Sequence, residues 1–233
     1  MDTDDNDKED LLKRACVDYS VSIAKGAIGA VPYVGPLIAE LVGTFIPGQR
    51  TDRIVKFVRE LSKKVADLEQ DYIKSQLRNE HFSDLLQEGL LQASRSLSDE
   101  RRTYIASLIA NSLSSEEIEY QESKYLLRIL DEINDVEIIW LWFFVHLTSS
   151  AKAGARNKHP EVLKPVTAVV NSPQAIRDKA ALQKSYKEHL VRLGLLDKED
   201  ESYSLSSMGR LLLRQIGLID ANVVSDISPL LQI

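Results

Sequence analysis

KSYKEHLVRLGLLDKEDESYSLSSMGRLLLRQIG, residues 184–217, is the stretch of sequence that decides how the C-terminal part of the chain folds. Upstream of it, Ser172 and Pro173 predict the start of a helix, because serine is a favoured N-cap and proline is tolerated in a first turn. We expect this helix to reach Leu193. Gly194 then predicts the helix end, because glycine readily adopts the left-handed conformation that ends helices.

The quoted stretch resembles the recognition helix, the wing and the closing helix of winged helix-turn-helix domains. The resemblance implies that LVRLGLL packs the end of the helix, that DKEDESYSLS forms a short β-wing, and that SSMGRLLLRQI forms the closing helix. It implies a winged-helix-like module over residues 151–233. Modules of this kind bind DNA or dock onto other proteins, and both interpretations stay open here.

The expected helix carries an apolar face and a face of basic and polar residues. Four residues at helical spacing should face the core: Leu182, Tyr186, Leu190 and Leu193. Five residues are candidate contacts to nucleic acid or to a protein partner: Arg177, Gln183, Lys184, Lys187 and Arg192. Lysines on this face can reach phosphates, and the Gln183 amide can reach a base edge. The acidic wing would meet a phosphate backbone with like charge, so the sequence favours protein docking over weak DNA binding.

Charge is distributed unevenly along the chain. The net charge of −6 argues against a protein that is coated with nucleic acid over its whole surface. Residues 152–192 nevertheless carry nine basic and three acidic side chains, and they form the only basic region of the sequence. Residues 1–9 are densely acidic, and we expect them to be disordered, since they repel one another and have nothing to bury.

A heptad pattern dominates the region after residue 50. Apolar residues alternate in steps of four and three, which is typical of a helix packed along a seam: Ile54, Val58, Leu61, Val65, Leu68 and Tyr72. The pattern favours packing inside a helical bundle. A coiled-coil homo-oligomer through Ile54, Val58, Leu61, Val65 and Leu68 remains the alternative.

Further helices are expected over residues 81–95, 98–113 and 115–133, the last with a capping box of Ser114 and Glu117. Asn134 with Glu137 predicts a second capping box, which opens the apolar run IIWLWFFVHL, the expected central helix of its region. Residues 149–165 are interpreted as a domain linker or a long loop. The predicted fold is all-α: a multi-helix bundle over residues 10–150, then a small module over 151–233 with a short β-wing.

Residues 26–48 hold five glycines, three prolines and one charge, Glu40. They do not match a phosphate-binding loop, since Gly35 precedes a proline that has no N–H, and the prolines and Glu40 argue against a permanent membrane span. A broken helix pair buried in the bundle is the first interpretation. The alternative is an amphitropic, membrane-active segment that is released by a trigger, through Ile28, Val34, Leu37, Ile38, Leu41 and Phe45.

Two further resemblances concern the N-terminal part. The order of Gly29, Pro32, Gly35 and Pro47 is similar to the first helices of three-domain insecticidal crystal toxins, which belong to a pore-forming bundle. VPYVGPLIAELVGTFIPGQRTDRIVKF, ERRTYIASLIANSLS and LLRILDEINDVEIIWL resemble a group of uncharacterised bacterial helical proteins, some of which look like abortive-infection proteins of phage defence. The resemblance implies a context and brings no catalytic residues.

No catalytic or metal-binding pattern is visible in the sequence. His81, His146, His159 and His189 lack metal-ligand spacing, and Cys16 is the single cysteine, so no intramolecular disulfide can form. We interpret His146 as a satisfied core residue. The sequence predicts a non-enzymatic, cytoplasmic interaction or regulatory protein without cofactor. A protein partner is expected first, DNA second, and a membrane only on triggering.

Overall fold

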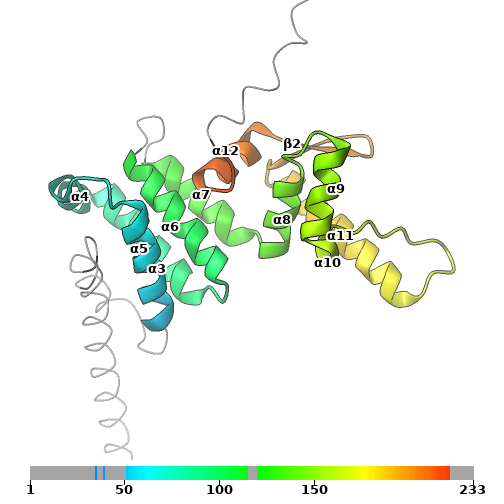
Figure 1. Cartoon of the computed structure of the whole chain (residues 1–233), viewed down its shortest axis with the longest axis horizontal. Helices are drawn as coiled ribbons and strands as arrows, with labels where there is room; N and C mark the ends of the chain where they lie inside the picture. Colours follow the sequence, from blue (N-terminus) through cyan, green and yellow to red (C-terminus); the bar gives the residue numbers. More distant parts are fainter. Residues whose placement is uncertain (1–34, 36–38, 40–50, 115–119, 221–233) are drawn as a thin grey trace, which may run out of the picture. The chain divides into compact units, whose positions relative to one another are not determined.

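The computed structural model describes residues 35, 39, 51–114 and 120–220. These residues are mostly helical, and the strands among them form one two-stranded antiparallel sheet near the C-terminal end (Figure 1). The described elements, in chain order, are α3 (Thr51–Lys64), α4 (Gln70–Leu77), α5 (Glu80–Arg95), α6 (Asp99–Ser114), α7 (Tyr120–Glu132), α8 (Asp135–Phe143), α9 (Ser149–Lys158), α10 (Pro160–Leu163), α11 (Gln174–Arg192), β1 (Leu196–Glu199), β2 (Ser202–Leu205) and α12 (Ser207–Gln215). The all-α class with a short β-hairpin is confirmed.

The chain divides into two compact units, and the second begins at Arg128, within α7. This boundary differs from the one expected near residue 150. Helix α8 packs against α10, α11 and α12, so the apolar run that it carries belongs to the second unit. Ile138, Trp140 and Leu141 are buried there. A helix that is apolar on several sides needs neighbours on several sides, and the second unit supplies them.

In the first unit, α3 packs mainly against α6 and α5. The seam residues Ile54, Val58, Leu61 and Val65 are buried within the single chain. The structure therefore favours the bundle interpretation, while an oligomer through these residues stays a prediction.

The prediction of one continuous helix along the whole heptad pattern is wrong, because α3 ends at Lys64 and α4 begins only at Gln70. The intervening turn leaves Leu68 half-buried and Tyr72 exposed. It lets Ile73 become fully buried instead, and the Tyr72 hydroxyl donates to the carbonyl oxygen of Leu113 at 2.9 Å.

Helices α5 and α6 confirm the sequence prediction closely. Asn79 caps α5, and its side chain accepts hydrogen bonds from the backbone N–H groups of His81 and Phe82. Gly89 lies in the contact between the two helices, since a Cβ there would stand 2.2 Å from Cδ1 of Ile109. The glycine hydrogen is what permits this packing.

Several sequence predictions fall outside the described residues. They concern the acidic residues 1–9, the Ser114–Glu117 capping box and the candidate membrane-active residues Ile28, Val34, Leu37, Ile38, Leu41 and Phe45. Of residues 26–48, the structure describes Gly35 and Ala39, and both are helical. Within the part of the chain that is described, no helix is long and apolar enough to cross a membrane.

Residues 149–165 are not a linker. Their first ten residues form α9, with the Thr148 hydroxyl accepting a hydrogen bond from the N–H of Ala151 at 3.2 Å. Pro160 then opens the short helix α10, at a position where its missing N–H costs nothing. Glycine and proline misled the sequence interpretation here: Gly154 is tolerated in an exposed turn of α9, and Pro160 starts a helix.

The interpretation of His146 as a satisfied core residue is wrong. Its ring is half-buried and packs edge-on against Trp142, with 4.6 Å between the ring centroids. Its Nε2 is buried and has no hydrogen-bond partner among the described residues. Burial and, after it, the charges of Lys152 and Lys158 lower the pKa of the His146 imidazole below its usual value.

Two glycines of the second unit should respond oppositely to alanine. A Cβ on Gly209 would lie 2.2 Å from the carbonyl oxygen of Leu195, which is rigid backbone, whereas a Cβ on Gly154 would meet nothing within 4 Å. We expect Gly209→Ala to lower the free energy of unfolding by more than about 2 kcal/mol. Gly154→Ala should raise it by about 0.5–1 kcal/mol, because alanine favours a helix interior. Urea denaturation measures both, and equal effects would contradict the close approach at Gly209.

The depressed pKa of His146 predicts a pH dependence of stability. Because the folded state holds this imidazole neutral, the unfolded state binds more protons as pH falls from about 6.5 through the folded-state pKa. Stability is therefore lost on acidification. We expect wild type to lose more stability than His146→Gln between about pH 7 and pH 5, measured as the shift of the urea midpoint. Identical losses would show that His146 does not titrate in this way.

Candidate functional site

Helix α11 ends as the sequence predicts. Gly194 adopts φ 69°, the N–H of Gly194 donates to the carbonyl of Val191, and the N–H of Leu195 donates to that of Leu190, both at 2.9 Å. This is the Schellman arrangement, and the accompanying apolar contact is supplied by Leu190 and Leu195, which are fully buried. The helix start differs slightly, since Pro173 occupies the N-cap position and makes no side-chain cap bond.

The predicted wing is a four-by-four-residue hairpin. Strands β1 and β2 pair antiparallel, with Leu196 opposite Leu205 and Glu199 opposite Ser202. Asp200 adopts a positive φ of 52° in the two-residue loop, a conformation that Asp tolerates better than most residues. The loop and its flanking acids are exposed, so the tip of the hairpin is negatively charged.

A buried acid joins α8 to α11. One carboxylate oxygen of Glu137 lies 2.7 Å from Nδ1 of His189, and the other accepts the backbone N–H of Asn134 at 2.8 Å. The Asn134 side chain accepts the N–H of Glu137 at 2.9 Å, which confirms the predicted capping box. Sequence reasoning found the box and missed His189, because nothing in the pattern ties a capping acid to a residue 52 positions away.

Lys187 does not face solvent as the sequence predicted. Its ammonium lies 5.3 Å from the ring centroid of Trp140 and 5.0 Å from that of Tyr203. Burial lowers the pKa of this lysine, and the attraction of Glu188 opposes the change. Lys187 therefore stabilises the junction of α8, α11 and β2 through cation–π contacts. It is a half-buried residue, poorly placed to reach a phosphate.

Glu188 fixes the hairpin to α11. Its Oε1 accepts hydrogen bonds from Nζ of Lys198 on β1 and from the hydroxyl of Tyr203 on β2, each at 2.8 Å. The hydrogen bond from Lys198, followed by that from Tyr203, holds the pKa of Glu188 below its usual value. The wing is thus attached through polar side chains whose roles the sequence did not indicate.

Leu182 and Gln183 exchange the roles that the sequence assigned to them. Leu182, predicted to face the core, is 53% exposed, whereas Gln183, predicted to contact a base edge, is buried. The Gln183 amide donates to the carbonyl oxygens of Val162 and Lys164, both at 2.9 Å, and accepts the N–H of Val166 at 3.3 Å. The backbone groups of this loop need hydrogen-bond partners, and the Gln183 amide supplies them. Gln183 therefore faces the inside of the unit, and Leu182 faces outward.

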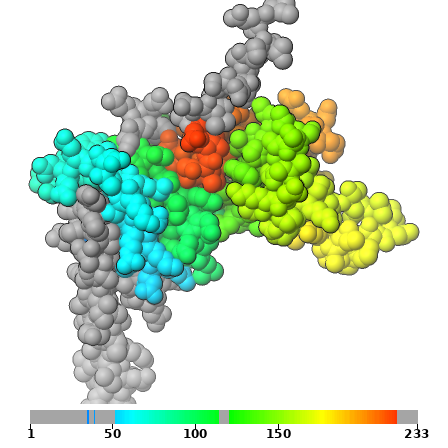
Figure 2. Space-filling view, in the orientation of Figure 1, coloured from blue at the N-terminus to red at the C-terminus, as the bar shows by residue number. Residues whose placement is uncertain are grey.

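Residues 164–182, which we call the arm, comprise the loop before α11 and the first half of that helix. Nearly every residue of the arm is exposed, and the arm projects from the rest of its unit in yellow in the space-filling view (Figure 2). It carries four large exposed apolar side chains: Val169, Val170, Ile176 and Leu182. The described residues hold eight such side chains, so half of them gather on this one short segment.

The remaining candidate contacts lie along α11. Arg177, Lys184 and Arg192 are exposed as predicted. The Arg177 guanidinium is oriented by a hydrogen bond to the Gln174 side chain at 2.7 Å. Asp178 is the single acid of the arm, against Lys164, Arg177 and Lys179. The structure therefore brings three of the five candidates to the surface and removes Gln183 and Lys187 from it.

Comparisons of the chain with protein-family models, with curated proteins and with solved structures give no match. Among residues 51–114 and 120–220, no three His, Cys, Asp or Glu side chains gather as a metal site would require.

Gln183 and Leu182 give a direct test of this geometry. Gln183→Leu leaves the N–H of Val166 and two carbonyls without their partner, so we expect a loss of about 1–3 kcal/mol in the free energy of unfolding. Hydrogen exchange at Val166 should accelerate. Leu182→Ala, at the exposed neighbouring position, should change stability by less than about 0.5 kcal/mol. A larger loss of stability for Leu182→Ala than for Gln183→Leu would instead support the sequence prediction of a core leucine and a surface glutamine.

Proposed function

We propose that this chain is a non-enzymatic interaction or regulatory protein that docks onto another protein through the arm. The observation that carries this proposal is the gathering of Val169, Val170, Ile176 and Leu182 on an exposed, projecting segment. Exposed apolar clusters rimmed by polar residues are typical of protein-binding surfaces. The rest of the second unit supports the arm, since α11 is fixed at its C-terminal half by His189, Lys187 and Glu188.

The charges of the arm define the chemistry of the partner. The arm carries Lys164, Arg177 and Lys179 against a single acid, Asp178. Lys184 lies about two turns after Arg177, so it stands on the same side of α11. The partner that fits is a protein segment that combines apolar side chains with acidic ones. Charge complementarity speeds association and excludes basic partners, while the apolar contacts supply most of the affinity.

DNA binding is less well supported than protein docking. Gln183 and Lys187 are engaged inside the unit, and the exposed hairpin tip carries acids that repel phosphates. Of the five candidate contacts, Arg177, Lys184 and Arg192 remain for a duplex. The winged-helix-like description of the module remains part of the proposal, as does a role in phage defence, which rests on the resemblance to abortive-infection proteins. The alternative of a membrane-active effector depends on residues 26–47, most of which lie outside the described residues.

A photo-crosslinking experiment in bacterial cells tests the docking surface. A benzophenone amino acid is introduced at Val170, which is 92% exposed, and at Leu147, which is exposed in the same unit but outside the arm. We expect a defined crosslinked protein from position 170 and none from position 147. With that protein purified, Val170→Asp combined with Leu182→Asp should weaken binding at least about tenfold, because two apolar contacts are lost and acidic charge is added.

Leu147→Asp is the matched control, and it should leave both the affinity and the circular dichroism unchanged. A surface that binds DNA instead would retard duplex DNA with a salt slope of about −3 for three phosphate contacts, which Arg177→Glu with Lys184→Glu would abolish. That result, with no specific crosslink at position 170, would reject the docking proposal.

A further inference from the structure

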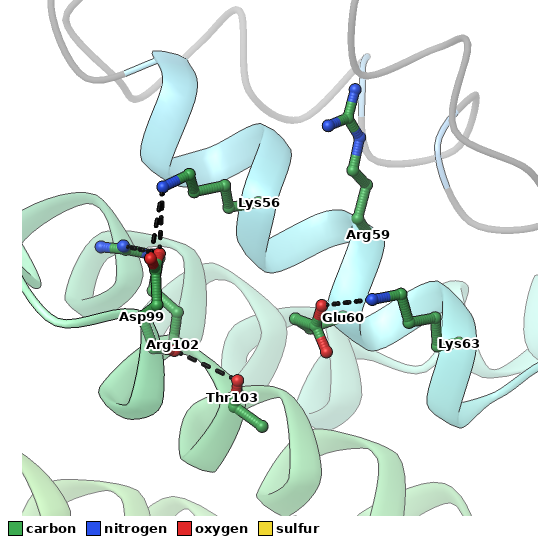
Figure 3. A pocket seen from close by; sticks show the side chains of 7 residues that line it. All are labelled: Lys56, Arg59, Glu60, Lys63, Asp99, Arg102 and Thr103. Atoms are coloured by element: carbon green, nitrogen blue, oxygen red, sulfur yellow. Dashed lines mark hydrogen bonds and ion pairs between the residues drawn. The ribbon is translucent and has the colours of Figure 1, made fainter.

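A cavity of about 300 Å³ lies in the first unit, between α3 and the beginning of α6. Its lining is charged, as Figure 3 shows in close-up. Four basic side chains and two acidic ones border it: Lys56, Arg59, Lys63, Arg102, Glu60 and Asp99. Thr103 adds a hydroxyl. The volume is at the lower end of the range of small-molecule sites.

The acids neutralise only part of this positive charge. Lys56 pairs with Asp99 at 3.2 Å, and Lys63 pairs with Glu60 at 2.6 Å. Arg102 also donates to Asp99, which makes this one carboxylate the partner of two cations. Arg59 has no ion pair among the described residues, and in Figure 3 its guanidinium extends from α3 apart from both pairs. The cavity therefore keeps an excess of two positive charges.

Arg102 is held rigidly at one side of the cavity. Its side chain is only 4% exposed, and Nη1 donates to the carbonyl oxygen of Ser96 at 2.6 Å. Its Nε is buried without an acceptor among the described residues. The hydrogen bonds from Arg102 and then from Lys56 hold the pKa of Asp99 below its usual value. The Asp99 carboxylate thus occupies the kind of position that an external anion would take between a lysine and an arginine.

We propose that this cavity binds a small phosphorylated molecule. A phosphate group matches the excess of two positive charges, and arginine and lysine donors together are the usual phosphate ligands of proteins. Lys56, Arg59 and Lys63 are exposed and supply the donors, while the buried Arg102 contributes its positive charge. The flanking Glu60 and Asp99 compete with the ligand. This site is independent of the arm and of the proposed docking function.

The test uses the full chain with inorganic pyrophosphate and ADP as probes, in titration calorimetry at low ionic strength. We expect both probes to bind, and equal affinities would identify the diphosphate as the recognised group. Tighter ADP binding would assign a nucleotide. Arg59→Ala should weaken binding about tenfold, since a charge-assisted contact is lost. Lys64→Ala is the matched control: it removes the same charge from the same helix, does not line the cavity, and should change affinity less than about twofold.

A variant of opposite sign makes the test sharper. Asp99→Asn removes the competing carboxylate, so it should strengthen pyrophosphate binding at least about threefold while lowering the melting temperature. Glu60→Gln removes the second competing carboxylate, whose ion pair with Lys63 lies within one helix and contributes little to stability. It should strengthen binding without a large loss of stability, and it serves if Asp99→Asn does not fold. Absence of heat with wild type, or equal weakening by Arg59→Ala and Lys64→Ala, would overturn the proposal.

Discussion

The second unit depends on the buried carboxylate of Glu137. With one oxygen it closes the N-terminal cap of α8, and with the other it binds His189 of α11 at 2.7 Å. The side chain is 3% exposed, so removing the His189 imidazole would leave one buried carboxylate oxygen without its hydrogen-bond partner, at a cost of about 1–3 kcal/mol. Such groups fix orientation more strictly than apolar contacts do, because hydrogen bonds are directional.

Further side chains of α11 hold the helix in the orientation that Glu137 fixes. Two residues before His189, Lys187 lies over Trp140 and Tyr203, and between them Glu188 receives the hydrogen bonds of Lys198 and Tyr203. Consecutive residues of one helical turn thus bind α8 and the hairpin. Further toward the N-terminus, Gln183 binds the loop before the helix. The part of α11 before Gln183 belongs to the arm, whose residues are nearly all exposed.

The first unit places charge in a different way. Its apolar residues pair α3 with α5 and α6, while the opposite edge of α3 presents basic residues to the start of α6. Asp99 at that start benefits from the positive end of the helix dipole and from two cations. This one acid pairs with both Lys56 and Arg102, and Arg59 is left without an ion pair among the described residues. The proposed phosphate site therefore follows from cations that the local packing leaves uncompensated, whereas the proposed docking surface follows from the exposed apolar side chains of the arm.

The sequence by itself determined the features that depend on neighbouring residues. The Asn134–Glu137 capping box, the Gly194 helix end and the apolar faces of α5 and α6 all follow from backbone geometry and local spacing. The short hairpin was expected from the resemblance to winged helix-turn-helix domains. Tertiary structure alone decided the burial of Gln183, the exposure of Leu182, the aromatic contacts of Lys187 and the pairing of Glu137 with His189. The helical wheel of α11 was ambiguous by one position, because leucine and glutamine at adjacent sites allow two rotations. The structure adopts the rotation in which Gln183 faces residues 162–166, because the backbone groups of that loop need hydrogen-bond partners. The helix pattern does not contain those residues, so it could not decide the rotation.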